Sequence, residues 1–140
     1  MTATRTVSLM QPYVPEAAIA AVERTLRTRW IGQGPQVEEF ERQFSARVAG
    51  GRACVAVSSC TAALHLSYLL AGIQPGDEVI APLFTCTATN IPLLHCGAKI
   101  RFADVAPGSL NVDSGTIADV ITERTKAVVV VHYGGQPARV

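Results

Sequence analysis

Residues 55–64 of this chain read Val55-Ala56-Val57-Ser58-Ser59-Cys60-Thr61-Ala62-Ala63-Leu64. The apolar stretch 54–57 predicts a short strand, and the Ala/Leu-rich residues after the polar turn predict a helix over 61–70. Such a turn presents unpaired backbone N–H groups and the positive end of a helix dipole at one place, which suits a phosphate group. The first functional hypothesis is therefore a ligand that carries a phosphate.

The same turn also has a purely structural interpretation. Ser58, Ser59 and Thr61 are of residue types that cap helix N-termini in many proteins, so helix capping stays open as an alternative. The turn lacks the Gly-Lys-Ser/Thr of a Walker loop and the spaced glycines of a dinucleotide fingerprint. These absences argue against a nucleoside triphosphate and against NAD.

Composition narrows the class of protein. The 140 residues are 49% hydrophobic and 16% charged, as expected for one globular domain or part of one. The net charge of +1 and the lack of a basic run give no case for nucleic acid or an anionic membrane as a partner. The N-terminus lacks the apolar core of a signal peptide, and the apolar run 127–131 is too short to span a bilayer.

The cysteines indicate a reducing compartment rather than a metal site. Cys54, Cys60, Cys86 and Cys96 have no C-x-x-C spacing, and the three histidines do not complete a recognisable ligand pattern. We expect reduced thiols in a cytoplasmic protein that holds no metal.

The remaining pattern predicts an α/β fold with a mostly parallel sheet and helices on both faces. Two helices, over 15–27 and 36–49, are separated by the Gly/Pro-rich break at Trp30–Pro35. Strands and helices then alternate: we expect strands at 54–57, 78–81, 99–103 and 127–131, and helices at 61–70, at 87–96 and after a cap at Asp113 or Ser114. The uninterrupted apolar run 127–131 predicts a strand buried on both faces.

Three polar or Gly-rich loops follow predicted strands, at 58–61, 82–87 and 132–135. The carboxyl ends of parallel strands share one edge of a sheet, where ligands of such sheets bind, so we expect the three loops to converge there. Because Val140 follows soon after a strand of central type, we interpret the sequence as the front portion of a larger catalytic domain.

Motifs along most of the chain resemble one known family. In chain order they read Trp30-x-Gly32-Gln33-Gly34-Pro35-x-Val37-x-x-Phe40-Glu41, Ser59-Cys60-Thr61-Ala62-Ala63-Leu64-His65-Leu66 and Gly76-Asp77-Glu78-Val79-Ile80-x-Pro82. They continue with Thr85-x-x-Ala88-Thr89, Gly97-Ala98, Asn111-x-Asp113 and Thr125-Lys126-Ala127…Val131-His132-x-x-Gly135-Gln136-Pro137-Ala138. From about Tyr13 onward the sequence resembles the DegT/StrS family of nucleotide-sugar aminotransferases.

The resemblance implies an incomplete large domain of pyridoxal phosphate (PLP) fold type I, in an enzyme that acts as a homodimer. Such enzymes use pyridoxal 5′-phosphate to move an amino group, usually from glutamate, onto the keto group of a nucleotide-linked sugar. Their products serve polysaccharide or cell-surface sugar synthesis.

The resemblance also assigns site residues. The turn that matches Ser59, Cys60 and Thr61 holds the cofactor phosphate in the family. Many members have Gly where this chain has Cys60, so we expect a regular first helical turn at this position rather than a positive φ. Cys86 stands where many members stack an aromatic ring on the pyridine; burial as a small apolar residue is the alternative.

The first 35 residues form a separate prediction. Trp30, Gly32 and Gln33 lie in a segment that resembles the region near the family's sugar-nucleotide site; a plain linker between two helices is the alternative. We therefore divide the chain into an N-terminal helix and substrate-loop segment, 1–35, and the truncated first part of the PLP-binding large domain, 36–140.

A catalytic lysine is missing from the predicted site. Transamination needs a lysine that forms a Schiff base with PLP, and the family carries it on a later segment than the one that residues 1–140 resemble. Lys99 and Lys126 both stand at amino ends of predicted strands, opposite the site. We expect residues 1–140 alone to be inactive.

Three other functions remain open. The family also contains PLP-dependent sugar dehydratases, which have a histidine in place of the lysine. A different α/β enzyme that binds a phosphate without PLP has the same kind of turn. A non-catalytic fragment of a truncated or decayed gene is the third alternative.

Overall fold

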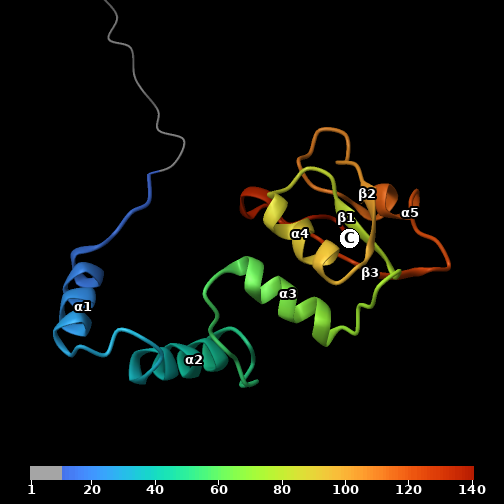
Figure 1. The fold of residues 1–140 in the computed structure, drawn as a ribbon. Coiled ribbons are helices and arrows are strands. Elements are labelled where there is room, and N and C mark those ends of the chain that lie inside the picture. Colours follow the sequence, from blue (N-terminus) through green and yellow to red (C-terminus); the bar gives the residue numbers. More distant parts are fainter. Residues whose placement is uncertain (1–10) are drawn as a thin grey trace, which may run out of the picture. The chain divides into compact units, whose positions relative to one another are not determined.

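The computed structural model describes residues 11–140, which form two compact units, 11–56 and 57–140 (Figure 1). Each unit is described by itself. No helix among residues 11–140 is long and apolar enough to cross a membrane. The same residues contain no group of three or more His, Cys, Asp or Glu side chains placed to hold a metal ion.

The first unit contains the two predicted helices, α1 (Glu16–Arg27) and α2 (Pro35–Arg47). Both starts differ from the prediction by one residue: Pro15 is the N-cap of α1 rather than its first residue, and Pro35, predicted to belong to the break, is the first residue of α2. Just beyond the end of α1, Arg29 has a φ of 63°, the left-handed conformation that glycine usually supplies at this position. It is the one non-glycine residue among 11–140 with a positive φ.

The second unit is built on a parallel sheet of β1 (Glu78–Pro82), β2 (Lys99–Ala103) and β3 (Thr125–Val128). The strand order is β2-β1-β3, and both pairings are parallel, as predicted. Val79 lies opposite Ile100 on one side and opposite Ala127 on the other. The central strand β1 is therefore the strand whose residues are all buried.

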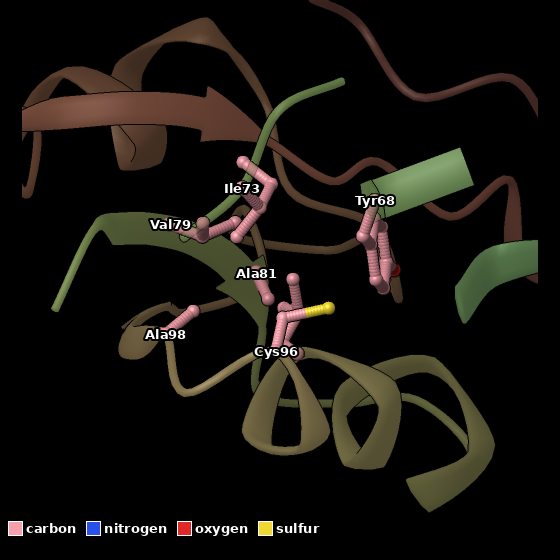
Figure 2. Packing of buried hydrophobic residues seen from close by; sticks show 7 residues of the cluster. Tyr68, Ile73, Val79, Ala81, Cys96 and Ala98 are labelled. Carbon is pink, nitrogen blue, oxygen red and sulfur yellow. The ribbon is translucent and has the colours of Figure 1, made fainter. Parts of the chain in front are cut away.

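Helices cover both faces of this sheet, which confirms the predicted α/β layering. On one face, Val79 and Ala81 of β1 pack with Tyr68 of α3 (Cys60–Leu70) and with Leu93 of α4 (Thr87–His95). Figure 2 shows this cluster gathered between β1, α3 and α4. On the other face, Ile80 packs with residues near α5 (Ser114–Ala118). Because side chains alternate along a strand, β1 contributes to both cores.

One strand prediction is wrong, and another is confirmed only in part. Residues 54–57 form no strand: the N–H of Ala56 donates to the Glu41 carboxylate at 2.7 Å, and a strand needs backbone partners instead. The last strand is β3, which starts earlier than the predicted 127–131 and is only half buried. Its position at an edge of the sheet explains the exposure, since the strand buried on both faces is the central one, β1.

Candidate functional site

The polar turn at 58–61 opens α3 as a regular helical turn. Ser59 is the N-cap, with an extended backbone, and its hydroxyl oxygen accepts the N–H of Ala62 at 3.1 Å. Within residues 11–140, the N–H groups of Cys60 and Thr61 make no hydrogen bond. Capping and anion binding are therefore compatible at this turn, because the cap uses an oxygen lone pair of Ser59 and leaves two amides and the hydroxyl proton to donate.

The charge around this turn also favours an anion. Helices α1 and α2 each carry a glutamate in the first turn, Glu16 and Glu38, which compensates the positive end of the helix dipole. The first turn of α3 has no acidic residue. As expected, Cys60 has no positive φ, so the turn directs its amides as an ordinary helix N-terminus does.

Tyr68, in the last turn of α3, connects this helix with the start of α4. Its side chain is buried, and its hydroxyl donates to the backbone carbonyl of Thr89 at 3.1 Å. Burial raises the pKa of the Tyr68 phenol, and the neighbouring thiols of Cys60 and Cys96 raise it further. The Thr89 hydroxyl in turn lies 3.0 Å from that of Thr85, in the loop after β1.

Cys86 is the N-cap of α4, and its thiol is exposed. Cys86 is therefore not a buried packing residue of this unit. Like α3, α4 has no acidic residue in its first turn. Both helices thus begin with uncompensated amides.

The loop after β3 meets the loop after β1, as predicted for the carboxyl edge of the sheet. The ring of Tyr133, in the short helix η1 (Tyr133–Gly135), lies 5.0 Å from the ring of Phe84 between centroids. Buried Asn111 accepts the N–H of Tyr133 and donates to the carbonyl of Gln136, both at 2.8 Å. Figure 1 shows η1 beside the start of α4.

His132 has a structural partner in this loop. Its Nδ1 accepts the N–H of Ala138 at 3.0 Å. This bond holds the chain after η1 and gives His132 a structural role.

Sequence reasoning gave no role to four residues here, Tyr68, Phe84, Asn111 and Tyr133, although Asn111 stands in one of the family motifs. Phe84 and Tyr133 lie within the loops predicted to converge, so their position carried a signal. Tyr68 and Asn111 act through contacts 21 and 22 residues away, and no local pattern indicates such contacts.

The other predicted site residues, Trp30, Gly32 and Gln33, lie in one loop between α1 and α2. The Trp30 indole N–H donates to the Gln33 carbonyl at 2.8 Å, and a Cβ at Gly34 would lie 2.3 Å from the indole nitrogen. A cavity of about 370 Å³ lies beside this loop, lined by residues that include Trp30, Ile31 and Gly32. The loop is therefore folded against its own tryptophan and is more than an unstructured linker.

Both lysines lie where the sequence predicts. Lys99 is the first residue of β2 and Lys126 is the second residue of β3. Both strands run parallel to β1, so the two lysines stand at the amino edge, opposite the loops that contain Ser59 and Cys86.

The comparisons with known proteins now decide the family. The sequence model of the DegT/DnrJ/EryC1/StrS aminotransferase family matches residues 12–140. The chain belongs to this family. The spore coat polysaccharide biosynthesis protein SpsC of Bacillus subtilis (strain 168), one relative of this DegT/DnrJ/EryC1/StrS chain, is 45% identical over 125 residues, 89% of the chain and 32% of SpsC.

Other members of the DegT/DnrJ/EryC1/StrS family agree. The UDP-4-amino-4-deoxy-L-arabinose–oxoglutarate aminotransferase of Shewanella sediminis (strain HAW-EB3) is 42% identical over 91% of the chain and 32% of its own length. The PLP-form of the putative sugar aminotransferase Spr1654 from Streptococcus pneumoniae has a TM-score of 0.84 at 34% identity, and 96% of the chain matches 34% of that protein. The chain spans about a third of the length of the curated relatives it matches.

Proposed function

We propose that the full-length protein is a PLP-dependent aminotransferase that moves an amino group, expected to come from glutamate, onto a keto nucleotide-sugar. Family membership supports the reaction class, and the names of relatives support the substrate class. The solved PLP and pyridoxamine phosphate (PMP) forms of one relative support the cofactor. In this chain, the observation that carries the proposal is the start of α3, where two amides make no hydrogen bond within residues 11–140 and the first turn contains no acidic residue.

The residues present fit the phosphate of PLP. The N–H groups of Cys60 and Thr61 and the hydroxyl of Ser59 are neutral donors at the positive end of a helix dipole, a donor set that binds phosphate. Cys86 would lie near the pyridine ring, where an exposed thiol offers a smaller contact area than an aromatic ring. When bound, PLP supplies the electron sink that amino transfer needs.

These residues bind and orient; they do not transfer protons. The α3 turn anchors the ligand by its phosphate, and the bond between Tyr68 and Thr89 holds the start of α4 against α3. Fixing the start of α4 relative to α3 favours one orientation of a bound ring and reduces the entropy cost of binding.

Substitution of Cys60 by proline tests the anchor. Proline is well tolerated as the first residue of a helix, and Ser59 already has the extended backbone that must precede it, so Cys60→Pro removes one N–H with α3 intact. A hydrogen bond to a charged group contributes about 1.5–3 kcal/mol, so we expect roughly 10- to 100-fold weaker PLP binding by absorbance titration.

Glu16→Pro is the matched control, because Glu16 is the first residue of α1 and also follows an extended residue. It should leave PLP affinity unchanged. Unaltered affinity in Cys60→Pro, with the helix content preserved, would contradict the anchor.

The covalent lysine lies outside residues 1–140 in our proposal, and this part of the chain is inactive by itself. Both of its lysines stand at the amino edge of the sheet. Borohydride reduction of the full-length protein with PLP, followed by peptide mass spectrometry, should find no pyridoxyl group on Lys99 or Lys126. A label on either lysine would overturn this placement.

We further propose that Trp30, Gly32 and Gln33 contact the nucleotide sugar, and that 1–35 and 36–140 are the substrate-loop segment and the first part of the large domain. The anchored Trp30 indole and the adjacent cavity support this role. We also propose a homodimer in the cytoplasm, where free thiols such as those of Cys54, Cys60, Cys86 and Cys96 stay reduced.

A further inference from the structure

Phe84 and Tyr133, which we call the aromatic pair, stand at the carboxyl edge of the sheet without a role in the function proposed so far. Their ring centroids are 5.0 Å apart with an angle of 48° between the planes, a tilted geometry that aromatic rings favour. Although they contact each other, Phe84 is 46% exposed and Tyr133 is 40% exposed. Each ring therefore keeps a free face that could contact a ligand.

The pair is held in place by a buried amide. Asn111 is 5% exposed and bonds to the backbone on both sides of η1, at Tyr133 N–H and at the Gln136 carbonyl. Within this turn Gly134 and Gly135 have φ values of 63° and 78°, so the backbone needs glycine to follow this path. The single side chain of Asn111 thus fixes the position of Tyr133 before any ligand arrives.

Contacts connect the aromatic pair to α3, the helix that the phosphate-binding turn opens. Phe84 precedes Thr85, whose hydroxyl pairs with that of Thr89, and the Thr89 carbonyl accepts the hydroxyl of Tyr68 from α3. The pair comes from the loops after β1 and β3, which are neighbours in the sheet. The helix that carries the phosphate donors and the loops that carry the free aromatic faces are therefore joined by these contacts.

We propose that the aromatic pair forms the wall that contacts the ring of the bound coenzyme, and that Asn111 is the residue that positions this wall. The inference rests on the proposed PLP function. A ligand with a planar ring joined to a phosphate matches both parts of the edge, since a ring gains contact energy on an aromatic face and a phosphate gains it from the amides. Exposed Cys86 offers the ring less contact area than the pair does.

The test separates ring from phosphate. In the full-length protein, dissociation constants are measured for pyridoxine 5′-phosphate, which has ring and phosphate but no aldehyde, and for inorganic phosphate. We expect Phe84→Leu and Tyr133→Leu each to weaken the binding of pyridoxine 5′-phosphate roughly 3- to 10-fold, because each removes an aromatic contact. Neither should change the affinity for inorganic phosphate.

Phe102→Leu is the matched control, since Phe102 is also 46% exposed but lies on β2. It should change neither constant. Equal affinity of the parent and both wall variants for pyridoxine 5′-phosphate would overturn the inference. A parent that binds neither this compound nor PLP would instead overturn the proposed function.

A double-mutant cycle tests the positioning role of Asn111. Asn111→Ala should weaken the binding of pyridoxine 5′-phosphate when it is introduced into the parent. It should have no further effect when it is added to Tyr133→Leu, because Asn111 acts through Tyr133. If Asn111→Ala fails to fold, Asn111→Asp replaces it: one oxygen still accepts the Tyr133 N–H, but no N–H remains for the Gln136 carbonyl. An equal loss of affinity for pyridoxine 5′-phosphate and for inorganic phosphate would overturn the positioning role. So would the same loss of affinity in the parent and in Tyr133→Leu.

Discussion

The two ends of the central strand β1 differ in how far their polar groups are already paired within the protein. At the amino end, the carboxylate of Glu78 accepts the Thr122 hydroxyl and lies 3.8 Å from Arg101 Nε and 3.5 Å from Arg124 Nη2. At the carboxyl end, among residues 11–140, the amides of Cys60 and Thr61 have no acceptor and two aromatic rings keep free faces. At the amino end the charged groups are paired with one another, whereas the carboxyl end has unpaired hydrogen-bond donors and exposed aromatic faces.

The difference indicates that the amino end of β1 contributes to stability and the carboxyl end to ligand binding. Paired charges and tight turns at the amino end stabilise the fold and leave no unpaired groups for a ligand. Unpaired groups at the carboxyl end lower the stability of the free protein, and a bound ligand that pairs with them raises it again. Substitutions at the amino end should therefore change stability with little effect on affinity.

Gly97→Ala should have the largest effect on stability. Gly97 follows α4 at the amino edge of the sheet with a φ of 72°, and an added Cβ would lie 3.0 Å from Cα and Cβ of Pro75. Left-handed strain and overpacking together should lower the free energy of unfolding by roughly 2–4 kcal/mol. Urea unfolding measures the loss, and PLP affinity of the folded fraction should not change.

Gly108→Ala separates the two causes. Gly108 has nearly the same φ, 73°, but nothing within 4 Å of an added Cβ. It should cost about 1 kcal/mol, from backbone strain alone. Equal losses in the two variants would show that the contact with Pro75 adds nothing.

Tyr68→Phe should have a smaller effect, and this variant acts at the carboxyl end. It removes the buried hydrogen bond to the Thr89 carbonyl that ties α3 to α4, at a cost of about 1 kcal/mol. Because this hydrogen bond fixes the start of α4 relative to α3, PLP affinity should fall as well. Ser67→Ala is the control: its hydroxyl bonds only within α3, to Ala63, so affinity should stay at the parent value. A loss of stability in Tyr68→Phe without any loss of affinity would contradict the link to the site.

Much of the fold follows from local pattern. The glycines and prolines that bound each segment, the capping residue Asp113 and the apolar stretches predict the helices and three of the strands within a few residues. Strand pairing does not follow so directly. The apolar run 127–131 predicts a central strand, yet burial on both faces belongs to β1, whose sequence Glu78-Val79-Ile80-Ala81-Pro82 begins with a charge. Burial depends on strand order, which local pattern does not contain.

The candidate site divides in the same way. Ser59, Cys60 and Thr61 are predictable, because a helix start is a local feature with a known electrostatic consequence. Asn111 is not, since its role depends on hydrogen bonds to residues 22 and 25 positions away. Contacts made by tertiary packing, as for Asn111 and Tyr68, become visible only in the folded chain.

Lowering the pH should loosen the amino end through Glu78. The hydrogen bond from Thr122 lowers the pKa of Glu78 below its ordinary 4.5, Arg101 and Arg124 lower it further, and burial opposes them. Because the folded pKa lies below the unfolded one, the Glu78 carboxylate stabilises the fold above about pH 4.5, and this contribution is lost as the pH falls through the folded pKa. Glu78→Gln lacks this carboxylate, so the difference in urea midpoint between parent and variant should narrow from neutral pH to about pH 3.

Asp119→Asn is the control for general charge effects, because it removes an acidic residue from the same unit at the end of α5. The difference in urea midpoint between the parent and Asp119→Asn should show no such narrowing. A gap between the parent and Glu78→Gln that stays constant over this range would mean that the ion pairs at the amino end do not stabilise the sheet.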